Sequence, residues 1–206
     1  MKLRLYANGD DAVSGLEYYL IIINIIGFIL FAVNAWLYSN TAEGQVDKFL
    51  TITALLGGSP GIILCILIFD RKAVKGNMMS RVFVACVFVI QIVIFLVLKG
   101  VHGDKLTFAF WEFFANYKIL LIYLGIINFV TFIAFAVDKI AAIRRRSRIR
   151  IVTLLGLCFI GGSLGGLGAM YILHHKTNKE KNDFFTVGVP LIIVMQVVVM
   201  FYIMNL

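Results

Sequence analysis

Long apolar runs separated by short polar segments are the dominant pattern of this chain. Six runs, at residues 18–38, 49–69, 82–98, 119–141, 151–173 and 184–204, are rich in Leu, Ile, Val and Phe. A hydrocarbon core about 30 Å thick requires about 20 such residues in a helix. The runs do not alternate in polarity as barrel strands do, and lipid favours segments whose backbone groups are hydrogen-bonded internally. The pattern predicts an all-α integral membrane protein with six transmembrane helices.

The polar interruptions of these runs recur about 104 residues later. Asn24 and Gly57-Gly58-Ser59 correspond to Asn128 and Gly161-Gly162-Ser163. Gln91 corresponds to Gln196, which lies 105 residues later, so the alignment shifts by one residue there. We therefore expect a first three-helix repeat at 1–99, degenerate in sequence, and a second three-helix repeat at 119–206, with an aromatic connector between them at 100–118 that lies in the membrane interface. Because three crossings per copy is an odd number, the second copy is expected to be inverted, as in many transporters.

Composition and charge agree with a membrane protein and suggest an orientation. The chain is 61% hydrophobic and only 15% charged. With six crossings, twelve Lys and Arg residues flank the N-terminal side of the membrane and seven flank the other side. The positive-inside rule then predicts a multi-pass protein of the cell membrane with both termini cytoplasmic. Anionic lipid headgroups are the expected partners of a basic run: Arg144, Arg145, Arg146, Arg148 and Arg150.

Polar side chains recur at matching depths of the two repeats. The candidate midplane set is Asn24, Ser59, Gln91, Asn128, Ser163 and Gln196. Polar groups in hydrocarbon either form interhelical hydrogen bonds or line a water-filled path, and the sequence leaves both interpretations open.

Small residues accompany these polar positions. The glycines expected at helix crossings are Gly57, Gly58, Gly61, Gly161, Gly162 and Gly165. They either allow close approach of neighbouring backbones or, with Pro60 following the first pair, break a helix in mid-membrane as in discontinuous transporter helices.

Basic residues and histidines follow the second run of each repeat. The set is Arg71, Lys72, Lys75, His175, Lys176 and Lys179. These are either solvated cations at the headgroup layer or two vestibules for an anionic ligand. His174 and His175 are adjacent, so their side chains point about 100° apart on a helix, and we expect no metal site. Cys65, Cys86 and Cys158 lie inside apolar runs, where we expect thiols to act as small packing groups.

Several motifs of the second half resemble a known family. They are Asp138-Lys139, Gly161-Gly162-Ser163-Leu-Gly165, Met170, His175-Lys176-Thr177-Asn-Lys179, Pro190 and Gln196. Together they resemble the bacterial membrane family DUF1294, a domain of unknown function, and the first half resembles a decayed copy of it. The chain thus looks like a tandem of two such domains. This resemblance implies a membrane fold in a bacterial cytoplasmic membrane and implies no particular activity.

The sequence leaves three functions open. The inverted repeats favour a transporter or channel for a small solute or ion, with its site between the repeats. The small residues and headgroup cations equally suit a scaffold that interacts with lipid, and a membrane enzyme acting through His174 or His175 is the third interpretation. No nucleotide-binding or catalytic motif is present in the sequence, so we expect no cofactor and no nucleic-acid partner; a homo-oligomer is compatible with the pattern.

Overall fold

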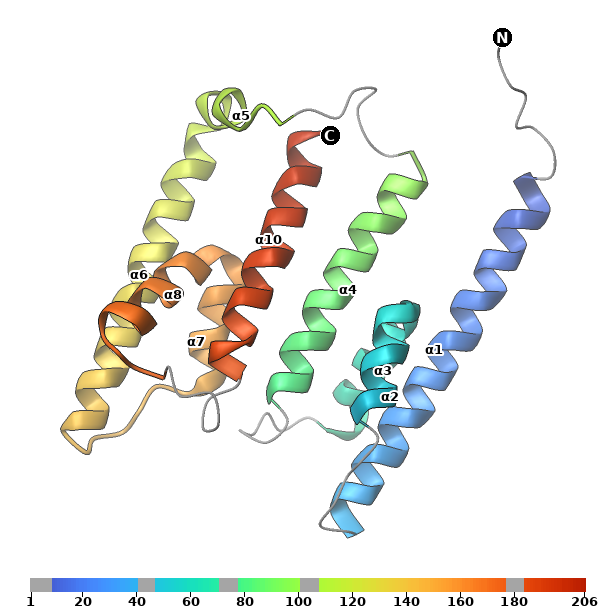
Figure 1. Ribbon diagram of the computed structural model, residues 1–206, viewed down its shortest axis with the longest axis horizontal. Coiled ribbons are helices and arrows are strands. Elements are labelled where there is room, and N and C mark those ends of the chain that lie inside the picture. The colour runs from blue at the N-terminus through green and yellow to red at the C-terminus, as the bar shows by residue number, and fades with distance from the viewer. Residues whose placement is uncertain (1–8, 41–46, 71–77, 101–107, 177–183) are drawn as a thin grey trace. The chain divides into compact units, whose positions relative to one another are not determined.

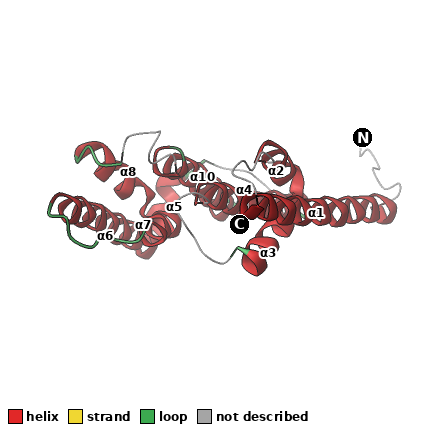
Figure 2. Ribbon diagram, turned by 90° about the horizontal axis from the view of Figure 1, so that it is seen from below, coloured by secondary structure: helices red, strands yellow, loops and turns green. Residues whose placement is uncertain are grey.

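The computed structural model describes residues 9–40, 47–70, 78–100, 108–176 and 184–206. The described residues form helices, turns and loops without a β-strand (Figure 2). Six helical segments are long and apolar enough to cross a membrane: Gly15–Leu37, Lys48–Phe69, Met78–Leu98, Lys118–Ile143, Ile151–Ile172 and Phe184–Met204. The prediction of an all-α, multi-pass membrane protein is confirmed at this level.

The chain divides into two compact units, Met1–Lys72 and Ala73–Leu206. The first unit contains α1 (Gly9–Asn40), α2 (Asp47–Thr53), the short π-helical turn η1 (Ala54–Gly58) and α3 (Ser59–Phe69). The second contains α4 (Met78–Leu98), α5 (Phe110–Asn116), α6 (Lys118–Ile143), α7 (Ile151–Leu157), the π-helical turn η3 (Cys158–Gly162), α8 (Ser163–Ile172) and α10 (Gly188–Met204). The two units are defined by packing and the predicted repeats by sequence similarity, so their boundaries differ. The repeat boundaries stay a prediction.

The segment from α7 to α8 is a helical hairpin (Figure 1). Ile149, just before α7, and His175, just after α8, bind the same carboxylate, that of Asp138 near the end of α6. In a continuous helix, residues 26 positions apart in the sequence would lie about 39 Å apart. The sequence left open whether the segment at 151–173 is broken, and the structure shows that it is: its two ends meet at one end of α6, and we call α7–η3–α8 hairpin 2.

A left-handed glycine makes each reversal possible. Gly161 has φ of 126° and Gly57 has φ of 112°, values that side-chain-bearing residues rarely adopt. In the first unit, the reversal at Gly57 lies between α2 and α3, and both helices pack against α1; we call α2–η1–α3 hairpin 1. Pro60 stands in the first turn of α3, where its missing N–H has no helical partner to lose. The expected span at 49–69 is thus also folded back at its glycines.

Parallel packing relates α4 to α10, the last helices of the two predicted repeats. Val82 near the start of α4 lies next to Gly188 at the start of α10, and Phe108, which follows α4, stacks on Phe201 near the end of α10. The two helices lie side by side in both views (Figures 1 and 2). An inverted pair of three-crossing repeats would make these helices antiparallel, so the packing differs from that expectation. The parallel packing agrees with a middle segment that turns back on itself at its glycines.

The core of the second unit lies between hairpin 2, α4, α6 and α10. Phe135, Phe184, Phe185 and Ile192 are fully buried there, with Cys86 and Cys158 among them. Cys65 is equally buried in the first unit, so the three thiols are packing groups as expected. The aromatic connector forms the short helix α5, whose Phe113 is buried against Phe114 and Tyr117 while Trp111 is exposed. Its location in the membrane interface stays a prediction.

Candidate functional site

Asn128 on α6 caps the tip of hairpin 2. The reversal at Gly161 interrupts the helical hydrogen-bond ladder and frees backbone groups that hydrocarbon cannot satisfy. The Asn128 side-chain amide donates to the Gly161 carbonyl oxygen at 2.9 Å and to the Leu124 carbonyl oxygen at 2.8 Å. Its oxygen accepts from the Gly165 N–H at 2.7 Å. One side chain thereby joins both sides of the break to α6.

A tyrosine one turn earlier completes this cap. The Tyr123 hydroxyl donates to the Ile160 carbonyl oxygen at 2.7 Å. The sequence analysis did not identify this residue. The signal was available, since Tyr19 stands 104 residues before it, five positions from Asn24 just as Tyr123 is five positions from Asn128.

The first unit repeats this arrangement bond for bond. Asn24 donates to the carbonyl oxygens of Gly57 at 3.2 Å and Leu20 at 2.7 Å, and accepts from the Gly61 N–H at 2.7 Å. The Tyr19 hydroxyl donates to the Leu56 carbonyl oxygen at 2.7 Å. Every partner is shifted by the same 104 residues.

The hairpin glycines lie against the long helix of their own unit. A Cβ on Gly61 would overlap the Asn24 carbonyl, and a Cβ on Gly165 would overlap the Asn128 carbonyl. A Cβ on Gly162 would overlap the Thr131 side chain, which is fully buried on α6. Gly58 is similarly confined by Thr53 and Ile23. Both sequence interpretations therefore apply to these glycines, because they allow close approach and also break the helix.

Gln196 on α10 adds a second cap to hairpin 2. Its amide donates to the carbonyl oxygens of Cys158 at 2.7 Å and Phe159 at 3.1 Å, and its oxygen accepts from the Ser163 hydroxyl. Asn128, Ser163 and Gln196 thus gather at one tip. Both N–H bonds of each amide are used within the protein, which leaves neither amide a donor for a ligand.

The other members of the predicted polar set lie on other elements. Asn24 and the fully buried Ser59 belong to the first unit, and Gln91 is half-buried on α4.

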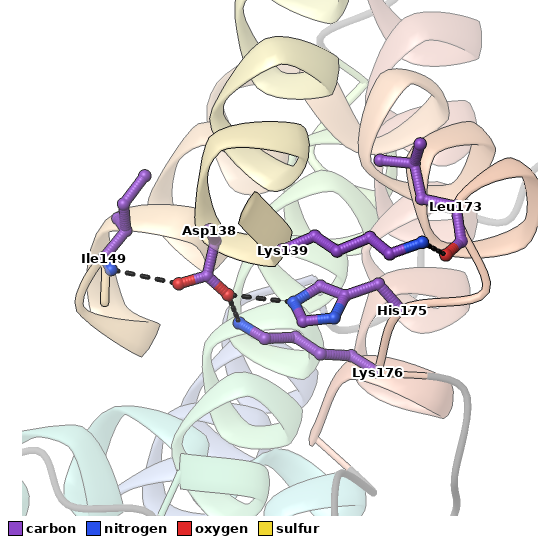
Figure 3. A network of polar contacts seen from close by, with 6 residues as sticks. All are labelled: Asp138, Lys139, Ile149, Leu173, His175 and Lys176. Atoms are coloured by element: carbon purple, nitrogen blue, oxygen red, sulfur yellow. Dashed lines mark hydrogen bonds and ion pairs between the residues drawn. The ribbon is translucent and has the colours of Figure 1, made fainter. Parts of the chain in front are cut away.

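A buried carboxylate closes the base of hairpin 2 (Figure 3). Asp138 has no exposed surface. Its Oδ1 accepts from the Ile149 N–H at 3.0 Å, and its Oδ2 lies 3.0 Å from His175 Nε2 and 2.8 Å from Lys176 Nζ. Asp138 is therefore the residue at which the end of α6, the entry to α7 and the exit from α8 meet.

The sequence predicted His175 and Lys176 as headgroup residues but left the burial of Asp138 open. An Asp inside an apolar helix was the available signal. Left-handed backbone at His174 and Lys176, with φ of 46° and 61°, turns the chain after α8. His174 is exposed, whereas His175 and Lys176 point back to Asp138. The two adjacent histidines therefore have different surroundings.

Lys176 lies in an unusual environment for an ammonium group. Its side chain is 12% exposed, and Nζ lies 4.2 Å from the centre of the Phe185 ring and 5.7 Å from that of Phe135. Burial lowers the pKa of Lys176 below its usual value, although the ion pair with Asp138 opposes the shift. The neighbouring Lys139 donates to the Leu173 carbonyl oxygen at 2.6 Å, which ties the end of α8 to α6 a second time.

The other basic residues predicted from the sequence are exposed or lie outside the described residues. The exposed ones belong to the loop between α6 and α7: Arg144, Arg145, Arg146, Arg148 and Arg150. Arg71, Lys72, Lys75 and Lys179 lie outside the described residues. Groups of His, Cys, Asp or Glu that could bind a metal ion are not found in the part of the chain that the structure describes.

Taken together, the elements and contacts define a multi-pass helical membrane protein whose hairpins are capped at the tip and, in the second unit, latched at the base. Residues 128–182 match the family model described as a protein of unknown function, DUF1294. The match begins at the Asn128 cap and includes the tip glycines and the Asp138–His175–Lys176 latch. No curated protein and no protein of solved structure matches the chain.

Proposed function

We propose that the protein is a tandem pair of hairpin modules that serves as a membrane scaffold and binds anionic lipid headgroups. The observation that carries this proposal is the saturation of the hairpin tips. In both units the polar groups freed by the break are bound by Asn and Tyr side chains of the same unit. Such groups contribute to a fixed fold and leave no evident role for a solute at the tips.

The duplication is supported by the repeated hydrogen bonds at a constant offset of 104 residues. Two unrelated hairpins have no physical reason to use Tyr and Asn five positions apart on the preceding helix. Only the second copy lies within the matched family region, which agrees with a first copy that has diverged.

Lipid binding is supported by the exposed arginines of the loop between α6 and α7. Each basic residue near an anionic membrane surface contributes about 1 kcal/mol of attraction. Five arginines within residues 144–150 form a dense site for phosphate groups. The loop begins six residues after Asp138, so lipid bound there lies beside the base of hairpin 2.

The test is native mass spectrometry of the purified protein with phosphatidylglycerol and phosphatidylcholine. We expect preferential retention of phosphatidylglycerol, reduced about fivefold per removed charge in Arg144→Gln/Arg146→Gln/Arg148→Gln. The control, Lys99→Gln/Lys118→Gln, removes two exposed cations from other helix ends. A triple variant that retains the wild-type preference would overturn the lipid assignment.

Transport of a small solute or ion is the second candidate. Its support is that helices interrupted near mid-membrane are common at transporter sites. Flux of ions and small anions into liposomes containing the purified protein tests it. Flux that is abolished by Gln196→Leu, with folding retained, would favour transport over the scaffold.

A further inference from the structure

The hairpin geometry changes the number of times the chain crosses the membrane. Both ends of hairpin 2 meet at Asp138, so this segment enters and leaves at one end of α6. In the first unit, α3 runs in the same direction as α1, because Asn24 binds Gly61 while Phe28 contacts Phe69 further along both helices. Hairpin 1 therefore also returns toward the end where α1 finishes. Neither hairpin counts as a crossing.

We infer that the chain crosses the membrane four times, through α1, α4, α6 and α10, and that both hairpins enter from one face. The link from hairpin 1 to α4 contains Arg71, Lys72 and Lys75, and so short and charged a segment does not cross hydrocarbon. Hence α4 starts on the face of hairpin 1. The parallel helix α10 starts on the face of hairpin 2, which makes the two faces one. We call it the hairpin face.

Charge assigns the hairpin face to the cytoplasm. Among the described residues, nine Lys and Arg flank it: Lys48, Arg81, Lys139, Arg144, Arg145, Arg146, Arg148, Arg150 and Lys176. Lys99 and Lys118 flank the opposite face. With the connecting segments added from the sequence, fourteen of the 19 cations belong to the hairpin face and five to the other. The positive-inside asymmetry is therefore larger than the twelve-to-seven ratio of a six-crossing chain.

The acidic residues sharpen the contrast. Six of the 11 Asp and Glu flank the hairpin face and five flank the other, so the whole net charge of +8 belongs to the hairpin face. This distribution suits a surface that rests on the anionic headgroups of the cytoplasmic leaflet. Both termini then lie on the opposite, non-cytoplasmic face, which reverses the orientation expected from six crossings.

Thiol labelling tests the topology without reference to function. Ser147→Cys, His174→Cys and Glu112→Cys each place a thiol at an exposed position, and the parent protein, whose native cysteines are buried, gives the background. Intact cells that express each variant are treated with a membrane-impermeant maleimide, before and after permeabilisation. We expect Ser147→Cys and His174→Cys to be labelled only after permeabilisation and Glu112→Cys to be labelled in intact cells.

Two outcomes would overturn the inference. Labelling of Ser147→Cys and His174→Cys from opposite faces would show that residues 151–172 cross the membrane, which would rule out a re-entrant hairpin. Labelling of both in intact cells, with Glu112→Cys protected, would reverse the orientation. A reporter fused after Leu206 provides an independent reading of the C-terminal side, and cytoplasmic activity of that reporter would contradict the inference even if the cysteine variants fail to accumulate. Neither measurement depends on lipid binding, so the proposed function can fail while the topology stands.

Discussion

At the scale of single residues, polar side chains in the described structure bind the backbone groups that the interrupted helices leave without helical hydrogen bonds. Asn128 provides one acceptor and two donors, and all three are used around the tip of hairpin 2. The sequence predicted Asn24, Asn128 and Gln196 as polar groups inside membrane-spanning segments, because a polar residue within an apolar run is easily recognised. It could not choose between a cap and a ligand site, because that depends on where the neighbouring carbonyl groups point.

Removal of the Asn128 side chain tests the cap. In Asn128→Ala the Gly165 N–H and the Gly161 carbonyl oxygen lose their partner in an apolar environment, and we expect a loss of about 2 kcal/mol in the free energy of unfolding. Thermal unfolding in detergent measures it, with the exposed Asn116→Ala as control. Equal midpoints for the two variants would show that the cap contributes nothing to stability.

The Asp138 latch makes a different prediction, because it joins opposite charges. Asp138→Asn leaves Lys176 buried without its counter-ion, which typically costs 3–5 kcal/mol for an ion pair that is fully buried. Removing the ammonium as well, in Asp138→Asn/Lys176→Met, should restore part of the loss. A double-mutant cycle measured by chemical unfolding gives the coupling, expected to be on the order of 1–3 kcal/mol. Additive effects of the two substitutions would show that the pair is not energetically coupled.

At the scale of elements, the hairpins depend on glycines that lie between two helices. The sequence predicted six apolar segments, and six are present. It did not predict that two of them fold back, because hydropathy counts apolar residues and does not record the direction of the chain. The local signal was the paired glycines near the centre of each segment, which permit a left-handed turn as well as close packing.

Two glycines of α8 provide a matched comparison. Gly165→Ala places a methyl group against the Asn128 backbone, and we expect a loss of about 1–3 kcal/mol from overpacking. Gly168→Ala, one turn further along the same helix, meets nothing within 4 Å and should be neutral or stabilise the helix by up to about 1 kcal/mol. Thermal unfolding of both variants decides the point. Indistinguishable midpoints would contradict the close approach of α8 to α6.

At the scale of the whole molecule, the account depends on counting crossings correctly. The sequence revealed two copies of one pattern, and the matching hydrogen bonds of the two hairpins agree with that reading. The conclusion that the copies are inverted rested on three crossings per copy. In the four-crossing topology that we infer, each copy has two crossings, and copies with an even number of crossings enter the membrane in the same direction. This distinction lies in long-range geometry, which local composition does not encode.

The central claim is that residues 151–172 form a hairpin, and the distance between its two ends tests it most directly. Spin labels at Ser147→Cys and His174→Cys, both exposed positions, allow measurement by double electron–electron resonance in nanodiscs. The hairpin brings both ends to Asp138 and predicts a distance below about 25 Å, whereas a continuous helix of the same residues predicts about 40 Å. A single distribution near 40 Å would contradict the account.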